Sequence, residues 1–552
     1  MQASDLRLGP VLSLRGVDRV DGRSWWRVSA MVGLPRDAGQ PALEVDGRAV
    51  AAPVLLLAHG DLQVLRYDLS TTLTAQEQRV TYGFAAAGVS WSFTVPADDL
   101  ALRLACVSCN GFSEAKKMRQ YAGRASSVWS DLVDRHEGAG RFHALLMGGD
   151  QVYMDSMWEE LEELKAWAEL SHVEQRGYPV SPAARARIED HYVSTYLDRW
   201  LPSRRGAWNE ARAGFDAADA MARIPTLMMW DDHDIFDGWG SYSAAMQAAP
   251  LPQALFACAR KAFWVFQMQH PAPLLPDNAL QPVTWSALRT QDPLLLPLLD
   301  DQPGFSCAMP LGPLALVLAD LRTERTRDQV LGEGTWRAIQ RWVGDIPAAG
   351  PAAGAATPRH LLFASSVPVT FPSVTAVDDL HDIFGSEHVT ESNADDLRDH
   401  WSHSDHAAER ARLAQLLVDT ARDKRIRVSI VSGDVHAAAW GSIFAKDAAS
   451  PLDWPAVHEL ISSGIVHPPT TGPVQWIYMK LLQRAARAVQ PIGPGHAARM
   501  HPLAGSEVEL VEARNWLALE LRASAQLHAR WRCEQGDGFV DHALEIEPAP
   551  AP

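Results

Sequence analysis

The chain contains little cysteine, and it has fewer basic than acidic residues. Only five of its 552 residues are cysteine, an odd number at low density, so no disulfide framework is expected. Acidic side chains outnumber basic ones by 67 to 50, which gives a formal net charge of −17. Because a negatively charged surface repels a phosphate backbone, we do not expect this protein to coat nucleic acid. A small phosphoester substrate is compatible with this charge, since a bound metal reverses the local sign.

Long apolar runs are also missing. No stretch of 18 or more apolar residues occurs, so no membrane span is expected. The first residues, MQASDLRLGPVLSLRG, contain no sustained apolar segment and no twin arginine, so no secretion signal is predicted. We therefore predict a cytoplasmic location, with a mature secreted form as the alternative. The sequence leaves the oligomeric state open.

Two patterns divide the chain. Residues 1–98 carry short alternating apolar runs separated by Gly, Pro, Asp and Asn, which predicts a small N-terminal β-sandwich. From residue 99 onward, strand-like runs alternate with amphipathic helical stretches, which predicts an α/β layer architecture. The predicted catalytic domain spans 99–552, and the short strands within 505–548 are expected to complete its sheet. A chain of this length favours two or more structural units.

Several common catalytic signatures are absent. The chain has no phosphate loop of the form G-x-x-x-x-G-K-[ST], no G-x-S-x-G elbow and no H-E-x-x-H zinc motif. It has instead polar residues at the ends of four strand-like apolar runs. Ligands of open α/β sheets bind at the carboxyl ends of strands, so these four ends predict one site.

The first two strand ends offer a thiol and a carboxylate. LRLACVSCNG stops at Cys109, and FHALLMGGDQVYMDS reaches Asp150, with Tyr153 about one helical turn further on. Cys109 can bind a metal as the thiolate, although a small buried hydrophobe is the alternative. A redox pair with Cys106 is also conceivable from the spacing, but Cys106 lies inside the apolar run, where a reactive thiol is poorly accessible. Asp150 has two oxygens, enough to bridge two metals, and a turn or helix cap is the alternative.

The other two strand ends combine aspartate with histidine. IPTLMMWDDHDIFDG places Asp232 and His233 between two further aspartates, and such carboxylates repel one another unless a cation compensates. Helix capping accounts for one of these aspartates but not for the cluster. IRVSIVSGDVHAAAWG ends in Asp434 and His436, which share one side of an extended turn. The sequence therefore predicts a metal or catalytic site.

The ordered series SC, GDQVY, WDDHD and SGDVH resembles the PhoD-like alkaline phosphatases, a branch of the calcineurin-like metallophosphoesterases. The segments VLADLRTERTRDQVLGEGTW, SSVPVTF and HWSHSDHAAERARL are also similar to that family. The resemblance covers about residues 99–470, and its motifs occur in the family's order. It implies a four-layer αββα metallophosphoesterase core with a two-metal centre, preceded by a small β domain.

The resemblance also implies two metal-binding sets. The first ion would be ferric iron, bound by Cys109, Tyr153 and His436. The second ion would be calcium, or zinc or manganese as in other branches, bound by Asp232 and Asp434.

The remaining roles implied by the resemblance concern the phosphate. Asp150 would bridge the two ions, and His233 would contact the phosphate. The expected reaction is attack of a metal-bound hydroxide on phosphorus, with His233 protonating the leaving group or stabilising the equatorial oxygens. Arg322 is a candidate phosphate clamp, and an arginine ion-paired near Asp320 is the alternative.

The substrate stays open at this stage. A phosphodiesterase acting on nucleotides or phospholipids is the alternative enzyme, and a non-catalytic metal-bearing binding module is the alternative of another class. The helical segment 154–222 is interpreted as a lid or cap. The wider superfamily has one more histidine ligand, for which no motif matches; the candidates are His360, His400, His403 and His406.

Overall fold

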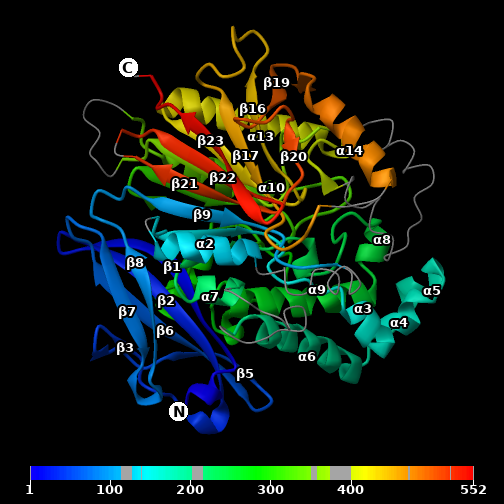
Figure 1. The fold of residues 1–552 in the computed structure, drawn as a ribbon. Coiled ribbons are helices and arrows are strands. Elements are labelled where there is room, and N and C mark those ends of the chain that lie inside the picture. The colour runs from blue at the N-terminus through cyan, green and yellow to red at the C-terminus, as the bar shows by residue number, and fades with distance from the viewer. Residues whose placement is uncertain are drawn as a thin grey trace.

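Strands and helices alternate along most of the chain, which confirms the predicted α/β class. The computed structural model describes residues 2–113, 127–138, 140–201, 216–349, 357–372, 399–469, 473–522 and 524–550. In Figure 1 the N-terminal strands lie at the lower left, and the helices within residues 157–199 lie at the lower right.

The first large sheet has ten strands in the order β23-β22-β21-β9-β10-β11-β1-β2-β6-β5. At its centre, β9 (Arg103–Val107), β10 (Ala144–Gly148) and β11 (Thr226–Met229) pair in parallel. All three strands lie within apolar runs that the sequence marks as strands, as expected for parallel strands covered on both faces.

The N-terminal strands belong to this same sheet. β1 (Leu8–Val20) pairs in parallel with β11 through Ser13 and Thr226, and β2 (Arg23–Pro35) pairs with β1 in the antiparallel sense. The ten-stranded sheet thus contains strands from both sides of residue 98, so the N-terminal strands are not the self-contained sandwich predicted ahead of a catalytic domain. The physical reason is that the first nine residues of β1 are buried, and buried backbone N–H and C=O groups need partners on both edges.

A second, smaller sheet covers the N-terminal part of the large one. Its order is β4-β3-β7-β8, and the rings of Tyr67 and Phe84 pack edge to face between the two sheets at a centroid distance of 5.7 Å. The bounds of the remaining N-terminal strands are β3 (Glu44–Val45), β4 (Arg48–Ala49), β5 (Val54–His59), β6 (Leu62–Thr72), β7 (Gln78–Phe84) and β8 (Val89–Val95).

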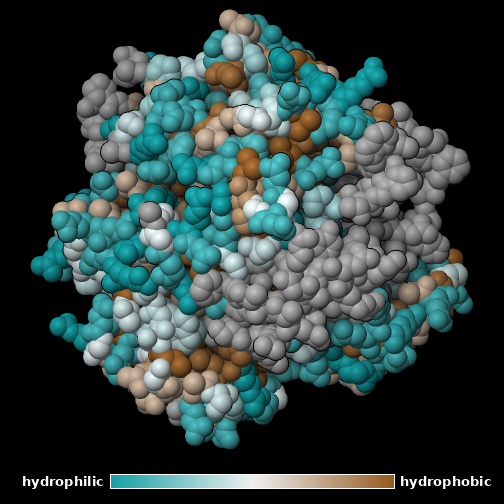
Figure 2. Space-filling view, viewed as in Figure 1, coloured by the Kyte–Doolittle hydropathy of each residue, from teal (hydrophilic) through white to brown (hydrophobic). Residues whose placement is uncertain are grey.

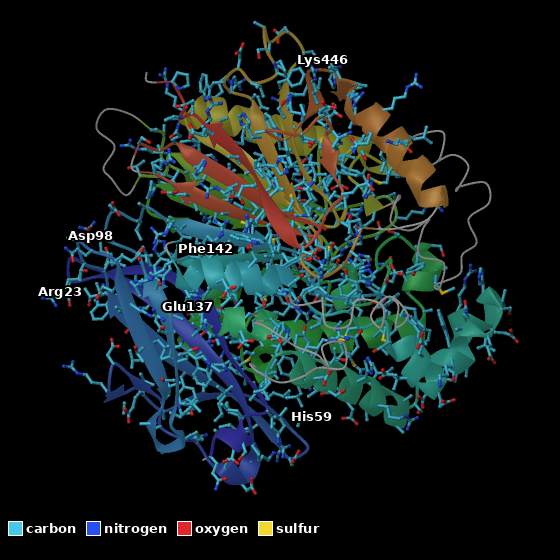
Figure 3. The ribbon with its side chains drawn as sticks, viewed as in Figure 1. Arg23, His59, Asp98, Glu137, Phe142 and Lys446 are labelled. Carbon is cyan, nitrogen blue, oxygen red and sulfur yellow. The ribbon has the colours of Figure 1, made fainter. Side chains whose placement is uncertain are left out.

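Side chains also attach the N-terminal strands to the helices. His59, at the end of β5, lies 2.6 Å from the Asp190 carboxylate of α6 (Pro182–Arg199), measured from Nε2. Arg79 of β7 donates to Glu137 at the end of α2 (Ser127–Glu137) at 2.8 Å. Both His59 and Glu137 are labelled in Figure 3. The N-terminal strands are therefore held by contacts as well as by the sheet.

Deleting residues 1–98 should prevent folding of the remainder. The deletion removes β1, so β11 loses a hydrogen-bonded neighbour and apolar surface of the core is exposed to water. Soluble yield and thermal melting of 99–552 measure this. A chain that lacks only residues 1–4, ahead of the buried Leu6, is the control and should melt like the full chain. A cooperative melt of 99–552 at the full-length temperature would contradict the expectation.

The C-terminal strands extend the other side of the first sheet. β21 (Asn515–Leu521) pairs with β9 in the antiparallel sense, and β22 (Leu527–Gln535) and β23 (Gly538–Ile546) follow outward. The sheet therefore contains strands from both ends of the chain.

The second large sheet follows the order β12-β13-β14-β15-β17-β16-β19-β18, with β20 paired to β16. Its central strands β13, β14, β15 and β17 are parallel. The bounds are β12 (Cys307–Leu311), β13 (Leu314–Leu318), β14 (His360–Ser365), β15 (Arg427–Ser432), β16 (Ala438–Ala445), β17 (Val457–Ser462), β18 (Gln490–Ile492), β19 (His496–His501) and β20 (Leu510–Val511).

Alternate residues of β14 face two different cores. Phe363 packs in a cluster with Ile339 of α10 (Glu333–Asp345) and Leu417 of α13 (Ala407–Lys424). Leu362 belongs instead to the large core that also contains Leu104 of β9. The second sheet is therefore covered by helices on one face and shares a core with the first sheet on the other.

The remaining helices are mostly short. Within the predicted helical segment 154–222, the helix is interrupted at Leu161, which is extended at φ −97° and ψ 118°. Part of the predicted cap, 202–215, lies outside the described residues. The helices are α3 (Met157–Glu160), α4 (Glu162–Ala168), α5 (His172–Gly177), α7 (Ala217–Met221), α8 (Ala244–Gln247), α9 (Pro250–Ala262), which continues as the π-helical turn Phe263–Gln267, and α14 (Pro473–Ala486).

Hydrophilic residues predominate on the face shown in Figure 2, among the residues that are coloured there. Within the described part of the chain, no helix has the length and apolar character needed to cross a membrane.

Candidate metal centre

Unusual backbone conformations mark the predicted ligands. Cys109, Asp150, Asp434 and His436 have φ angles of 56°, 55°, 70° and 49°, in the left-handed region that non-glycine residues seldom adopt. Each follows the carboxyl end of β9, β10 or β15. Strained residues of this kind cluster at functional sites, where the surrounding structure holds them in place.

Glycines allow the loops of the site to approach one another. A Cβ on Gly149, whose φ is 120°, would lie 2.7 Å from the Asp231 Cβ. A Cβ on Gly111 would lie 2.2 Å from a ring carbon of Tyr153. No side chain fits at such distances, so glycine is required at both positions.

The densest group consists of Asp150, Asp232 and His233. One potential ligand atom from each lies within 4.8 Å of the others. The Asp150 Oδ2 accepts a hydrogen bond from the Cys109 thiol at 3.4 Å and one from the Tyr153 hydroxyl at 3.5 Å. Its Oδ1 is buried without a hydrogen-bond partner. A buried carboxylate oxygen in that state fits a cation, and the donor types here are those that metals use.

The pKa shifts of these groups also indicate a site that suits a cation. Burial raises the pKa of Asp150 well above its usual range, and the nearby charge of Asp232 raises it further. Burial also raises the pKa values of Cys109 and Tyr153, with the Asp150 charge adding to the effect on both. A metal ion at this point would reverse these preferences and favour carboxylate, thiolate and phenolate.

Asp434 and His436 lie beside this group. Ser463 links them to it, because its Oγ lies 3.1 Å from the Cys109 Sγ and accepts from the His436 N–H at 3.0 Å. The Cys109 Sγ is also 3.9 Å from the Asp434 carbonyl oxygen. The structure therefore brings all six predicted metal ligands into one region, with Asp434 and His436 at its margin.

One of the four candidate histidines faces a predicted ligand. The His400 Nε2 lies 3.6 Å from the Asp434 Oδ2. The others have different partners: His360 contacts Ser429, His403 accepts from the Asp405 N–H, and His406 contacts the carbonyls of His400 and Arg327. The contact that selects His400 is between segments far apart in sequence, so no local motif signals it.

His233 is held on two sides. Its Nδ1 lies 2.7 Å from the Asp155 Oδ2, and its ring stacks on Tyr153 at a centroid distance of 4.2 Å. Burial by itself lowers the pKa of His233, but the Asp155 and Asp232 carboxylates outweigh burial and raise that pKa well above its ordinary value. Asp155 was missed at the sequence level, although it ends the same GDQVYMD segment.

Asp234 connects the loops of the site through hydrogen bonds. Its Oδ1 accepts from the N–H groups of Gln151 and Val152 at 3.0 and 3.1 Å and from the Gln267 amide at 2.9 Å. Its Oδ2 accepts from the Asp231 N–H at 2.9 Å. Both carboxylate oxygens are thus occupied by loop donors, and burial raises the pKa of Asp234 to about 7.

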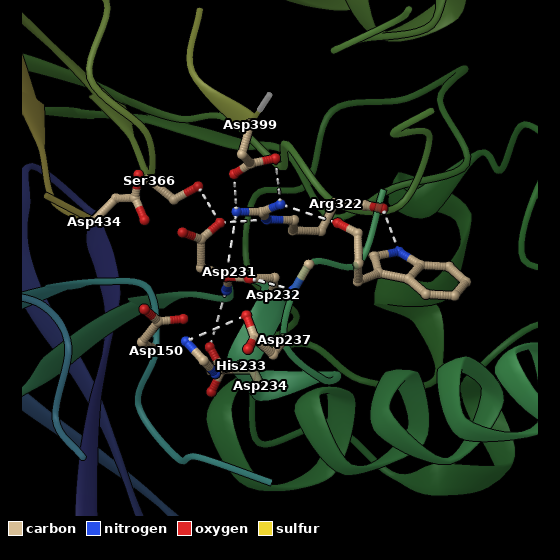
Figure 4. A network of polar contacts seen from close by, with 12 residues as sticks. Asp150, Asp231, Asp232, His233, Asp234, Asp237, Arg322, Ser366, Asp399 and Asp434 are labelled. Atoms are coloured by element: carbon tan, nitrogen blue, oxygen red, sulfur yellow. Dashed lines mark hydrogen bonds and ion pairs between the residues drawn. The ribbon is translucent and has the colours of Figure 1, made fainter. Parts of the chain in front are cut away.

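Arg322 is surrounded by acceptors inside the protein (Figure 4). Its Nη1 donates to Asp399 at 2.9 Å and to the Trp239 carbonyl at 3.0 Å, and its Nη2 donates to Asp399 at 2.6 Å and approaches Asp232 at 3.4 Å. Its Nε donates to Asp231. The side chain is 0% exposed, and each of the five N–H groups of a guanidinium has an acceptor here. The geometry therefore favours the ion-paired alternative over a phosphate clamp.

Two serines of the site were also missed in the sequence analysis. The Ser366 hydroxyl donates to the Asp231 Oδ1 at 2.7 Å, and Ser463 contacts Cys109 as described. They directly follow β14 and β17. Applying the strand-end rule to these two strands identifies both positions.

Comparisons with known proteins give a family and a relative for this chain. The model of a protein family described as PhoD related phosphatase matches residues 74–392 and 384–503, together more than half of the chain. Among curated proteins, Uncharacterized protein YGR266W of Saccharomyces cerevisiae is 26% identical over 450 residues, which cover 75% of this chain and 61% of the yeast protein. The chain thus spans about three fifths of that relative's length. The family match begins ahead of residue 98, as does the ten-stranded sheet.

Proposed function

Since the chain belongs to the family of PhoD-related phosphatases, we propose that it hydrolyses phosphoesters with the help of two metal ions. The observation that carries the proposal is the buried group of Asp150, Asp232 and His233, whose ligand atoms lie within 4.8 Å of one another. Carboxylates packed so closely away from water require a compensating cation. Two neighbouring metal ions are a common solution for transfer of a phosphoryl group to water.

The first ion would be held by Cys109, Tyr153 and His436, and Asp150 would connect it to the second. This set fits because Cys109 and Tyr153 both contact one oxygen of Asp150. The other oxygen of Asp150 has no hydrogen-bond partner, so it is suited to a second ion.

The second ion would be held by Asp232 and Asp434 together with Asp150. His400 is a further candidate ligand, because its Nε2 faces the Asp434 carboxylate at 3.6 Å. Oxygen ligands predominate in this set, which favours calcium, and an added imidazole also suits zinc.

The bound ions, His233 and the residues that hold the loops would have different roles in the reaction. Bound ions would supply an activated water and neutralise the phosphate charge. His233 would contact a phosphate oxygen or give the proton on its Nε2 to the leaving oxygen, since its Nδ1 is engaged by Asp155. Arg322 and Asp234 would keep the ligand loops in place through the contacts described above.

Assays of purified protein against phosphomonoesters and phosphodiesters, with elemental analysis of the same sample, test the proposal. We expect metal-dependent hydrolysis and two ions per chain. Preference for nucleotide or phospholipid diesters would select the diesterase alternative. Bound metal without turnover of any ester would select the binding module and overturn the proposal.

Replacing Tyr153 by phenylalanine should remove a visible colour. We propose that the first ion is ferric, and a phenolate or thiolate donating to ferric iron gives a charge-transfer band; a trivalent cation can hold Tyr153 as phenolate. Tyr153→Phe keeps the ring that stacks on His233, so the fold should persist while much of the absorbance is lost. Tyr67→Phe is the control, since that hydroxyl donates to the Pro41 carbonyl, in the loop between β2 and β3. A colourless, active enzyme containing only zinc or calcium would exclude the ferric site.

A further inference from the structure

A second imidazole lies directly against His436. The rings of His436 and His467 stack at a centroid distance of 3.8 Å, with 19° between their planes. The His467 ring is also nearly parallel to that of Tyr153, at 6.1 Å and 17°. His467 is 3% exposed. A buried histidine outside the family motifs therefore packs on one of the side chains assigned to the first ion and lies near another.

The backbone of this histidine is joined to the loop of Cys109. The N–H groups of Val466 and His467 donate to the Cys109 carbonyl at 3.3 and 3.1 Å, and the Ile465 N–H donates to the Ser108 carbonyl at 3.1 Å. These bonds connect the end of β17 in one sheet with the end of β9 in the other. The position of His467 is consequently tied to that of the thiol.

The His467 ring is fixed in its own plane as well. Its Nδ1 lies 2.9 Å from the Pro468 carbonyl oxygen, and because a carbonyl only accepts, Nδ1 carries the proton. His436, in contrast, has a φ of 49°, and its N–H is held by Ser463. The stacked ring thus gives His436 a rigid flat surface next to a strained backbone.

We propose that His467 is a positioning residue for the first ion. It holds the His436 imidazole in the plane in which a ring nitrogen meets an ion beside Cys109 and Tyr153. The inference rests on the two-metal function proposed above. It predicts that His467 affects the first ion and leaves the second, bound by the carboxylates, in place.

His467→Ala should weaken binding of the first ion by about 10- to 100-fold, the range found when a partner of a metal ligand is removed. The measurement is metal content after dialysis against graded chelator, together with calorimetric titration of the metal-free protein and its melting temperature. His467→Phe retains a flat ring and should keep most of the affinity. His501→Ala is the matched control, because His501 stacks on Trp440 at 4.4 Å and hydrogen bonds with Ser442 rather than with a predicted ligand.

Wild-type affinity in the His467→Ala variant would overturn the proposal, as would equal losses in the alanine and phenylalanine variants. Loss of both ions together with a large fall in melting temperature would also overturn it, since it would indicate only a structural role. Fewer than two ions in the wild-type protein would refute the two-metal function itself, and this result is seen before any variant is made.

Discussion

Replacing Asp150 by alanine should abolish phosphoester hydrolysis, with kcat/KM lowered by at least about 10³-fold, because metal ions stabilise the transition state by several kcal/mol. Asp150 is buried, one oxygen contacts both Cys109 and Tyr153, and the other has no hydrogen-bond partner. Water alone does not replace a ligand that connects two ions. His436→Ala should give a comparable loss. Steady-state kinetics with metal analysis measure both variants.

A second readout separates the metal site from the fold. In metal-free protein, Asp150→Asn should melt above the wild type at neutral pH, because burial and the Asp232 charge disfavour the ionised carboxylate of Asp150 in the folded state, whereas an amide carries no charge. In metal-loaded protein the order should reverse. Chelation of the wild type should also stop hydrolysis, and added metal should restore it. Near-normal turnover by a metal-replete Asp150→Ala variant would refute the two-metal assignment.

Replacing Arg322 by methionine should destabilise the protein by about 3–5 kcal/mol, the cost of leaving buried charges without their partner. Asp231 and Asp399 both lose a charged donor in this variant. Arg322→Lys should recover little, since an ammonium does not reproduce the planar fork that binds Asp399 with two bonds. Chemical denaturation measures the free energy of unfolding.

A double variant tests whether the ion pair is responsible. Arg322→Met combined with Asp231→Asn should be more stable than Arg322→Met alone, because Arg322 is the cation that pairs with Asp231 and the second substitution removes the carboxylate that has lost it. If Arg322 is instead a phosphate clamp, its replacement should change the kinetics and leave the stability unchanged. In that case Arg322→Met would raise KM or lower kcat while the free energy of unfolding stayed at the wild-type value.

The central strands of both sheets were predictable because they are short, apolar runs that end in polar residues. That β1 belongs to the ten-stranded sheet could not be predicted from the sequence. Local alternation marks residues 1–98 as β structure, but the pairing of Ser13 with Thr226 joins distant segments, and nothing local to either strand specifies its neighbour. The four-layer order of the core stays a prediction.

The sequence alone determined which loops carry the candidate site. Cys109, Asp150, Asp232 with His233, and Asp434 with His436 follow apolar runs, and the carboxyl ends of neighbouring parallel strands meet at one edge. Only the tertiary structure decided what the individual side chains do there. In the structure Asp234 accepts from backbone N–H groups, Arg322 pairs with Asp399, and His400 and His467 lie beside predicted ligands. The reason is that these roles depend on side-chain direction and on contacts between distant segments, whereas the strand ends depend only on local pattern.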